Sequence, residues 1–136
     1  MAWVVDTCLL IDVAEEDALF ARRSGELLEA KESDGLVACP VTLVEMGPMF
    51  GGVWEDLESF LQPMGVQWNA PWTDRDTEIA FHAWHAAVQR KRQRTVPLRP
   101  VADVLIGAFA LRFEGLLTRN AADFKTLFPT LNLVEP

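Results

Sequence analysis

The sequence predicts an α/β fold, a three-layer α/β/α sandwich with a central parallel sheet. Short apolar runs alternate with stretches of helical periodicity, which is typical of parallel strands joined by crossover helices. The runs contain almost no polar residues, as expected for strands that are buried on both faces. The 136 residues include neither an internal repeat nor a Gly/Ser-rich linker, which indicates one domain over residues 1–136.

Five strands are expected, at residues 2–5, 36–38, 66–68, 116–118 and 131–134. Helices are expected at residues 17–31, from Pro40 through Glu45, at 53–61, from Thr73 into the basic segment near residue 90, and at 101–112. Thr73 followed by Asp76 is an N-cap with an acid three residues later, and prolines at 40 and 100 suit the first turn of a helix.

Composition excludes several classes of protein. Hydrophobic residues make up 50% and charged residues 24%, the profile of a soluble globular protein. No apolar run reaches the roughly 18 residues that a membrane span needs, and the N-terminus lacks the basic region of a signal peptide. Cys8 and Cys39 do not form a CxxC pair and are expected to be reduced. The sequence therefore predicts a cytoplasmic protein without a membrane partner.

The net charge of −8 argues against a protein that coats nucleic acid non-specifically. The charge is unevenly distributed, because five of the twelve Lys and Arg residues lie in one segment: Arg90, Lys91, Arg92, Arg94 and Arg99. Such a patch suits contact with a short stretch of RNA. It equally suits a solvated helix end, where cations complement the helix dipole, and both interpretations stay open.

Four acids stand at or just after the ends of predicted strands, or in the helices that follow them: Asp6, Glu45, Asp103 and Asp123. Taken one at a time, each acid also suits a helix N-terminus or a solvated surface. Taken together, they lie at the rim where parallel sheets bind ligands. Carboxylates that converge repel one another, and a hard divalent cation such as Mg²⁺ or Mn²⁺ relieves that repulsion.

Four motifs in order complete the pattern: residues 4–11 (VVDTCLLI), 41–46 (VTLVEM), 100–110 (PVADVLIGAFA) and 117–124 (LTRNAADF). Their order and spacing resemble those of PIN-domain ribonucleases, in particular the small toxins of the VapC type. The resemblance implies a Mg²⁺- or Mn²⁺-dependent endoribonuclease that is the toxin of a type II toxin–antitoxin pair. It also implies a cognate antitoxin and a homodimer as partners.

The resemblance assigns roles to individual residues. Asp6 and Asp103 are the expected metal ligands, and Glu45 and Asp123 complete the catalytic cluster. Thr7, Thr118 and Asn120 are expected to orient ligands at the rim, and whether Asn120 or Asp123 fills the fourth acidic position stays open, as does the choice between one metal and two. RNA contacts are expected from Arg90, Lys91, Arg92, Arg94 and Arg119.

The sequence lacks the motifs of other enzymes that use an α/β fold. A dehalogenase-type phosphatase needs a second aspartate two residues after Asp6, where this chain has Cys8. The sequence contains neither a GxxxxGK[ST] nor a GxGxxG phosphate loop. The alternative that remains is a non-catalytic PIN-like module that binds a protein or an RNA without cleaving it.

Overall fold

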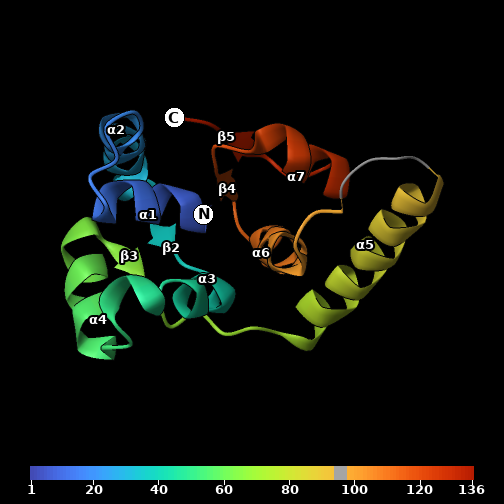
Figure 1. Cartoon of the computed structure of the whole chain (residues 1–136), viewed down its shortest axis with the longest axis horizontal. Coiled ribbons are helices and arrows are strands. Elements are labelled where there is room, and N and C mark those ends of the chain that lie inside the picture. The colour runs from blue at the N-terminus through green and yellow to red at the C-terminus, as the bar shows by residue number, and fades with distance from the viewer. Residues whose placement is uncertain (94–97) are drawn as a thin grey trace.

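A five-stranded parallel sheet forms the centre of the molecule (Figure 1). The structure is a computed structural model that describes residues 1–93 and 98–136. The strands lie in the order β3-β2-β1-β4-β5, and each neighbouring pair is parallel. Their bounds are β1 Trp3–Val5, β2 Leu36–Val37, β3 Val66–Gln67, β4 Gly115–Leu117 and β5 Leu133–Val134. The predicted fold class and the five predicted strands are confirmed.

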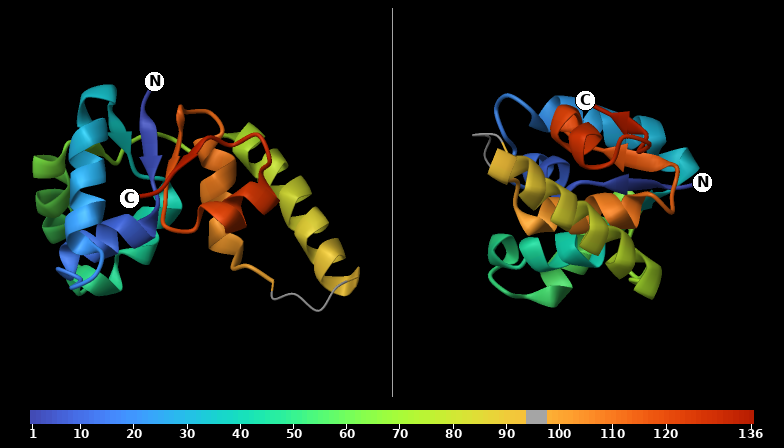
Figure 2. Two further views of the ribbon diagram at one scale, coloured as in Figure 1. Left: turned by 90° about the horizontal axis from the view of Figure 1, so that it is seen from above. Right: turned by 90° about the vertical axis from the view of Figure 1, so that its right-hand side faces the viewer.

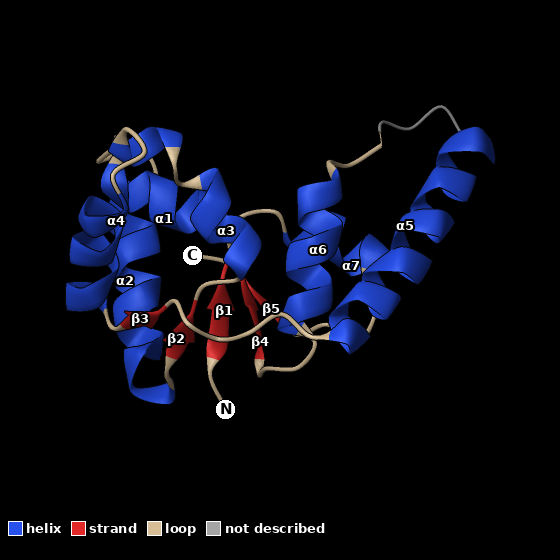
Figure 3. Cartoon of the chain, turned by 90° about the horizontal axis from the view of Figure 1, so that it is seen from below, coloured by secondary structure: helices blue, strands red, loops and turns tan. Residues whose placement is uncertain are grey.

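Helices cover both faces of the sheet, as Figure 3 shows. One layer consists of α1 (Thr7–Ala14), α2 (Ala21–Lys31) and α4 (Trp54–Leu61), and the other of α5 (Asp74–Gln93), α6 (Val101–Ala110) and α7 (Ala121–Leu127). The short helix α3 (Pro40–Glu45) lies beyond the carboxyl end of β1. In the part of the chain that the structure describes, 3₁₀ turns occupy Glu32–Asp34, Pro48–Phe50 and Gln62–Met64.

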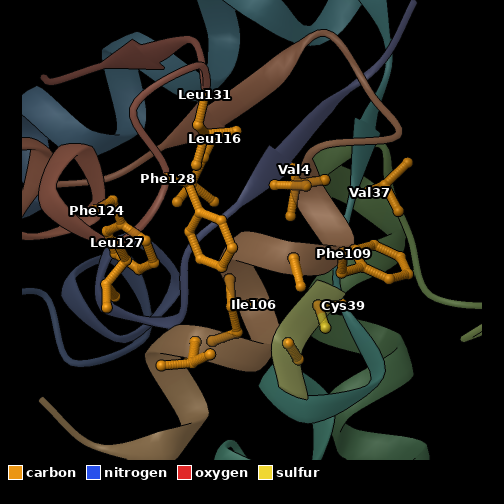
Figure 4. Close-up of a cluster of buried hydrophobic side chains, with 14 of the residues drawn as sticks. Val4, Val37, Cys39, Ile106, Phe109, Leu116, Phe124, Leu127, Phe128 and Leu131 are labelled. Carbon is orange, nitrogen blue, oxygen red and sulfur yellow. The ribbon is translucent and has the colours of Figure 1, made fainter. Parts of the chain in front are cut away.

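Successive strand residues point into different halves of the core, because side chains alternate across a sheet. Val4 and Leu116 pack among the side chains of α5, α6 and α7, including Phe109 and Phe124 (Figure 4). Val5 joins the second cluster, which α1, α2 and α4 cover. All three residues of β1 are buried, which is why its sequence is apolar without interruption.

One predicted helix boundary was wrong, and two helices were not predicted. The helix expected at residues 17–31 begins only at Ala21, because the Asp17 carboxylate accepts hydrogen bonds from the backbone N–H groups of Leu19 and Phe20 and forms a turn there. Helices α1 and α7 were not predicted, although α1 buries Leu9 completely and α7 buries Phe124 completely.

The helix starts predicted at Thr73, Pro40 and Pro100 are confirmed to within one residue. The Thr73 hydroxyl accepts from the Asp76 N–H at 3.2 Å, and the Asp76 carboxylate accepts from the Thr73 N–H at 3.0 Å, which is a reciprocal N-terminal cap. Pro40 is the first residue of α3, and Pro100 precedes α6. Helix α6 ends at Ala110, two residues earlier than expected.

Helix α5 is the outermost element of its layer and packs along α6 (Figure 2). It brings Ala80 and Ala87 into the core and leaves Phe81 exposed. Among the described helices, none is long and apolar enough to cross a membrane.

Gly107 allows α6 to pack against α7 and the segment after it. A Cβ atom at this position would clash with Phe128 Cε2 and would lie 3.3 Å from Phe124 Cδ1. We expect Gly107→Ala to lower the free energy of unfolding by about 1–3 kcal/mol through overpacking, measured by denaturant titration. The control is Gly25→Ala in α2, where a Cβ meets nothing within 4 Å. There alanine should stabilise the helix by up to about 1 kcal/mol, and equal losses in the two variants would contradict the packing argument.

Candidate active site

The strand order reverses at β1, which lies between β2 and β4. In open parallel sheets, ligands bind beyond the carboxyl ends of the strands at such a reversal. Asp6 follows β1 directly, and Thr118 follows β4 directly. These two side chains therefore meet at the edge of the sheet where a ligand site is expected.

Asp6 is the most constrained acid of the site. It is 4% exposed and caps α1, since one of its oxygens accepts from the Thr7 N–H at 2.8 Å. Its other oxygen, Oδ2, accepts from the Thr118 hydroxyl at 2.7 Å and from the Cys8 thiol at 3.3 Å. These contacts fix the orientation of the carboxylate.

Burial and charge both act on the protonation of this site. Burial raises the pKa of Asp6, and the negative charge of Asp103 raises it further, although the hydrogen bonds from Thr118, Cys8 and Thr7 oppose the shift. Burial and the Asp6 charge raise the pKa of the Cys8 thiol to about 12. Cys8 is therefore a neutral hydrogen-bond donor to Asp6, and a cation near Asp6 would favour its ionised form.

Asp103 and Asp123 meet at a shared cation, Arg99. The Arg99 Nη2 and Nε atoms lie 2.8 and 3.1 Å from Asp103 Oδ2. Its Nη1 atom lies 3.5 Å from Asp123 Oδ2. Burial lowers the pKa of the guanidinium, but the hydrogen bond and charge of Asp103, with the charges of Asp123 and Asp6, outweigh this effect and raise it. Two predicted site acids thus pair with one arginine, and the charge of a third, Asp6, acts on it from farther away.

Glu45 reaches the site through hydroxyl groups. It ends α3, and its Oε1 atom accepts from the Thr7 hydroxyl at 2.6 Å. The Thr7 hydroxyl also lies 2.9 Å from the fully buried Thr42 hydroxyl. Since a hydroxyl has one hydrogen, Thr42 donates to Thr7 while Thr7 donates to Glu45. Glu45 is otherwise exposed and is thereby tied to the residue next to Asp6. Helix α3 is short, and the Gly47-Pro48 pair follows it within two residues.

Thr118 and Asn120 lie on the loop between β4 and α7. The Thr118 hydroxyl accepts from the Asn120 N–H at 3.0 Å, which leaves its hydrogen for Asp6. Thr118 therefore orients Asp6, the kind of role expected for it. The ion pair with Arg99 favours Asp123 over Asn120 as the fourth acid of the cluster.

The side chains predicted to bind RNA differ in their surroundings. Arg119 is held by the buried Asp12, with its Nε and Nη2 atoms 2.8 and 3.0 Å from the two carboxylate oxygens, and it stacks over Phe20. These contacts favour a structural role for Arg119 over the expected contact with phosphate. Arg94 lies outside the described residues.

The other three predicted cations, Arg90, Lys91 and Arg92, form the C-terminal end of α5. Lys91 and Arg92 are exposed there, and Arg90 is half-buried. Figure 3 shows this end of α5 on the side toward which the strands point, where α6 also begins. The placement suits either RNA contact or a solvated helix end.

The sequence analysis did not assign Cys8, Thr42 or Arg99 to the acidic site, and it named Arg99 only as part of the basic segment. Arg99 stands four residues before Asp103, a spacing that pairs opposite charges along helices, so a local signal existed. Thr42 lies in the VTLVEM motif three residues before Glu45, but nothing in the sequence connects it with Thr7.

The donor atoms of the site suit a hard divalent cation. Asp6 and Asp103 supply carboxylate oxygens, and Mg²⁺ commonly binds one or two carboxylates and keeps several waters. Within residues 1–93 and 98–136, no three His, Cys, Asp or Glu side chains come together closely enough to hold a metal ion. A metal held by Asp6 and Asp103 would therefore need waters to complete its coordination.

Comparison with known proteins supports the fold. No protein-family model matches the chain, and no curated protein sequence matches it significantly. Among solved structures, it resembles a chain of VapBC2 from Rickettsia felis, determined as a complex bound to a DNA fragment from the VapBC2 promoter. The TM-score is 0.67 at 15% sequence identity, over 99% of this chain and 98% of the other. The fold is PIN-like. At this identity the likeness establishes the architecture alone.

Proposed function

We propose that this PIN-like protein is a Mg²⁺- or Mn²⁺-dependent endoribonuclease and the toxin of a type II toxin–antitoxin pair. The observation that carries the proposal is the position of Asp6 at the strand-order reversal, where the charge of Asp103 acts on it and Asp103 shares an arginine with Asp123. Acids from three distant parts of the chain converge there despite their repulsion, an arrangement expected of a cation-binding catalytic site.

In this proposal, some residues bind the metal and others hold the binding residues in position. Asp6 and Asp103 hold the metal, which when bound provides Lewis-acid activation of the phosphodiester and of a water molecule. Thr118, Cys8 and the Thr7 N–H keep Asp6 in one orientation. Thr42 and Thr7 direct Glu45 toward the same site, where its carboxylate can accept a proton from water. Arg90, Lys91 and Arg92 supply the phosphate contacts outside the cluster.

The proposal is tested by incubating the purified protein with a structured RNA in Mn²⁺, in Mg²⁺ and in excess EDTA. We expect internal cleavage with either metal and none with EDTA, because the cluster needs a cation to act on phosphate. Cleavage that persists in EDTA, or RNA that stays intact with both metals, would reject the assignment.

A non-catalytic PIN-like module is the competing function, and the Arg99 ion pairs favour it, because they already neutralise the acids. Calorimetric titration with Mn²⁺ separates the two. A module without catalysis should bind no divalent cation at the acids, whereas a nuclease should bind one and lose that binding in Asp6→Asn.

The proposal includes a cognate antitoxin, as in the VapBC2 complex of R. felis. The genes of such pairs are adjacent, so we expect a small DNA-binding protein to be encoded beside this chain. Co-expression with that neighbour should relieve growth inhibition by the wild-type protein. We place the pair in the cytoplasm, consistent with two free cysteines.

We also propose that the protein forms a homodimer across an apolar groove between α3, α5 and α6. The groove has a volume of about 540 Å³, and Val44, Phe81 and Val101, which are 78, 69 and 50% exposed, lie along it. In a two-fold pair the same patch faces itself, so exposed apolar side chains such as Phe81 can enter the groove of the other copy. Exposed apolar surface of this kind is typical of protein interfaces.

We expect Phe81→Asp to convert the dimer to a monomer in sedimentation equilibrium, because it places a charge in the apolar contact. Leu19→Asp is the matched control, since Leu19 is 76% exposed but lies outside the groove. A monomeric wild type, or a Phe81→Asp variant that remains dimeric, would show that this groove is not the dimer contact.

A further inference from the structure

Arg99 occupies a position that neither the predicted site nor the proposed mechanism explains. It precedes α6, and its side chain is 39% exposed. Two of its nitrogen atoms share Asp103 Oδ2, at 2.8 and 3.1 Å, and a third lies 3.5 Å from Asp123 Oδ2. The guanidinium therefore pairs with Asp103, which is a proposed metal ligand, and with Asp123, which is a further acid of the cluster.

A guanidinium and a divalent cation cannot both use this position without cost. Arg99 takes the lone-pair side of Asp103 Oδ2, so a metal at that oxygen must displace it. A metal at Asp103 Oδ1 or on Asp6 would stand close to the guanidinium, and like charges repel strongly at such distances. Because the Arg99 side chain is partly exposed, it can leave the ion pairs for water without burying its charge.

We propose that Arg99 sets the metal affinity of the site by competing with the divalent cation for Asp103 and Asp123. The inference rests on the proposed function, since it assumes that Asp6 and Asp103 bind a metal. Metal binding then exchanges one cation for another: the guanidinium moves out of the cluster as the ion enters. The arrangement lowers carboxylate repulsion when no metal is bound, and it makes the apparent affinity weaker than the acids alone would give.

The test is calorimetric titration of Mn²⁺ into the wild type, Arg99→Gln and Arg99→Lys. Arg99→Gln removes the charge and should bind Mn²⁺ about three- to thirtyfold more tightly, the range expected when a partly exposed ion pair no longer competes. Arg99→Lys keeps the charge and should stay near the wild-type affinity. Arg75→Gln is the matched control, because Arg75 forms an exposed pair with Glu78 on α5, away from the cluster, and should change nothing.

A second measurement uses only the wild-type protein, so it does not depend on whether the variants fold. The Arg99 Nε–H resonance should shift in nitrogen–proton NMR spectra as Mg²⁺ is added, in step with metal binding, because the group leaves Asp103. Equal Mn²⁺ affinity in the wild type and Arg99→Gln, weaker binding in Arg99→Gln, or an Nε–H resonance unmoved by Mg²⁺ would each overturn the inference while leaving the nuclease intact. An absence of metal binding in every variant would overturn both.

Discussion

Asp103→Asn is expected to reduce metal-dependent RNA cleavage by about 100- to 1,000-fold. A divalent cation contributes several kcal/mol to phosphoryl transfer, and each 1.4 kcal/mol or so corresponds to a factor of ten in rate. Asparagine keeps the shape of the side chain but removes the charge that binds the metal. The measurement is the single-turnover rate on one RNA, at saturating enzyme and at several Mn²⁺ concentrations.

The matched control is Asp74→Asn. Asp74 stands in the first turn of α5 as Asp103 does in the first turn of α6, but it is exposed and belongs to no acid cluster. The Asp74→Asn variant should cleave RNA at the wild-type rate. A similar loss in both variants would attribute the effect to helix stability, and a wild-type rate in Asp103→Asn would remove Asp103 from the metal site.

The fold could be predicted because its signals are local. Strand β1 reads as continuous apolar sequence since both of its faces are buried, and the acid at its end marks the edge of the sheet. Asp6 and Asp103 lie at the same edge because Asp6 follows β1, while α6 begins on the side toward which the strands point. Asp123 joins them for the same reason, since it follows β4.

The contacts that decide individual roles could not be predicted. Arg119 looked like a phosphate ligand because it stands in the LTRNAADF motif, yet it pairs with Asp12, 107 residues earlier in the chain. Asp12 lies in α1, a helix that the sequence did not reveal, so the buried acid that attracts Arg119 had no assigned position. Pairings across such separations depend on packing, which sequence periodicity does not encode.

A second large effect is expected at a buried ion pair far from the proposed chemistry. Asp76 on α5 is fully buried, and its carboxylate oxygens lie 2.9 and 3.0 Å from Arg112 Nε and Nη2. Arg112 follows α6, donates to the Pro71 carbonyl at 2.8 Å and stacks over Phe109. The pair therefore fixes the start of α5 to the end of α6.

Arg112→Met should lower the free energy of unfolding by about 3–5 kcal/mol, because it leaves the Asp76 carboxylate buried without a cation. Methionine keeps much of the apolar contact with Phe109, so the loss reports mainly on charge. Denaturant unfolding measures it, with Arg22→Met as control: Arg22 pairs with Glu26 at 90 and 63% side-chain exposure and should contribute less than about 1 kcal/mol.

A double variant separates the unpaired charge from the lost packing. Asp76→Asn combined with Arg112→Met leaves no buried charge, while the asparagine oxygen can still accept from the Thr73 N–H. It should recover part of the stability that Arg112→Met loses. A double variant as unstable as the sum of the single ones would mean that the two residues act independently, and the stability of this helix pair would then come from its apolar contacts.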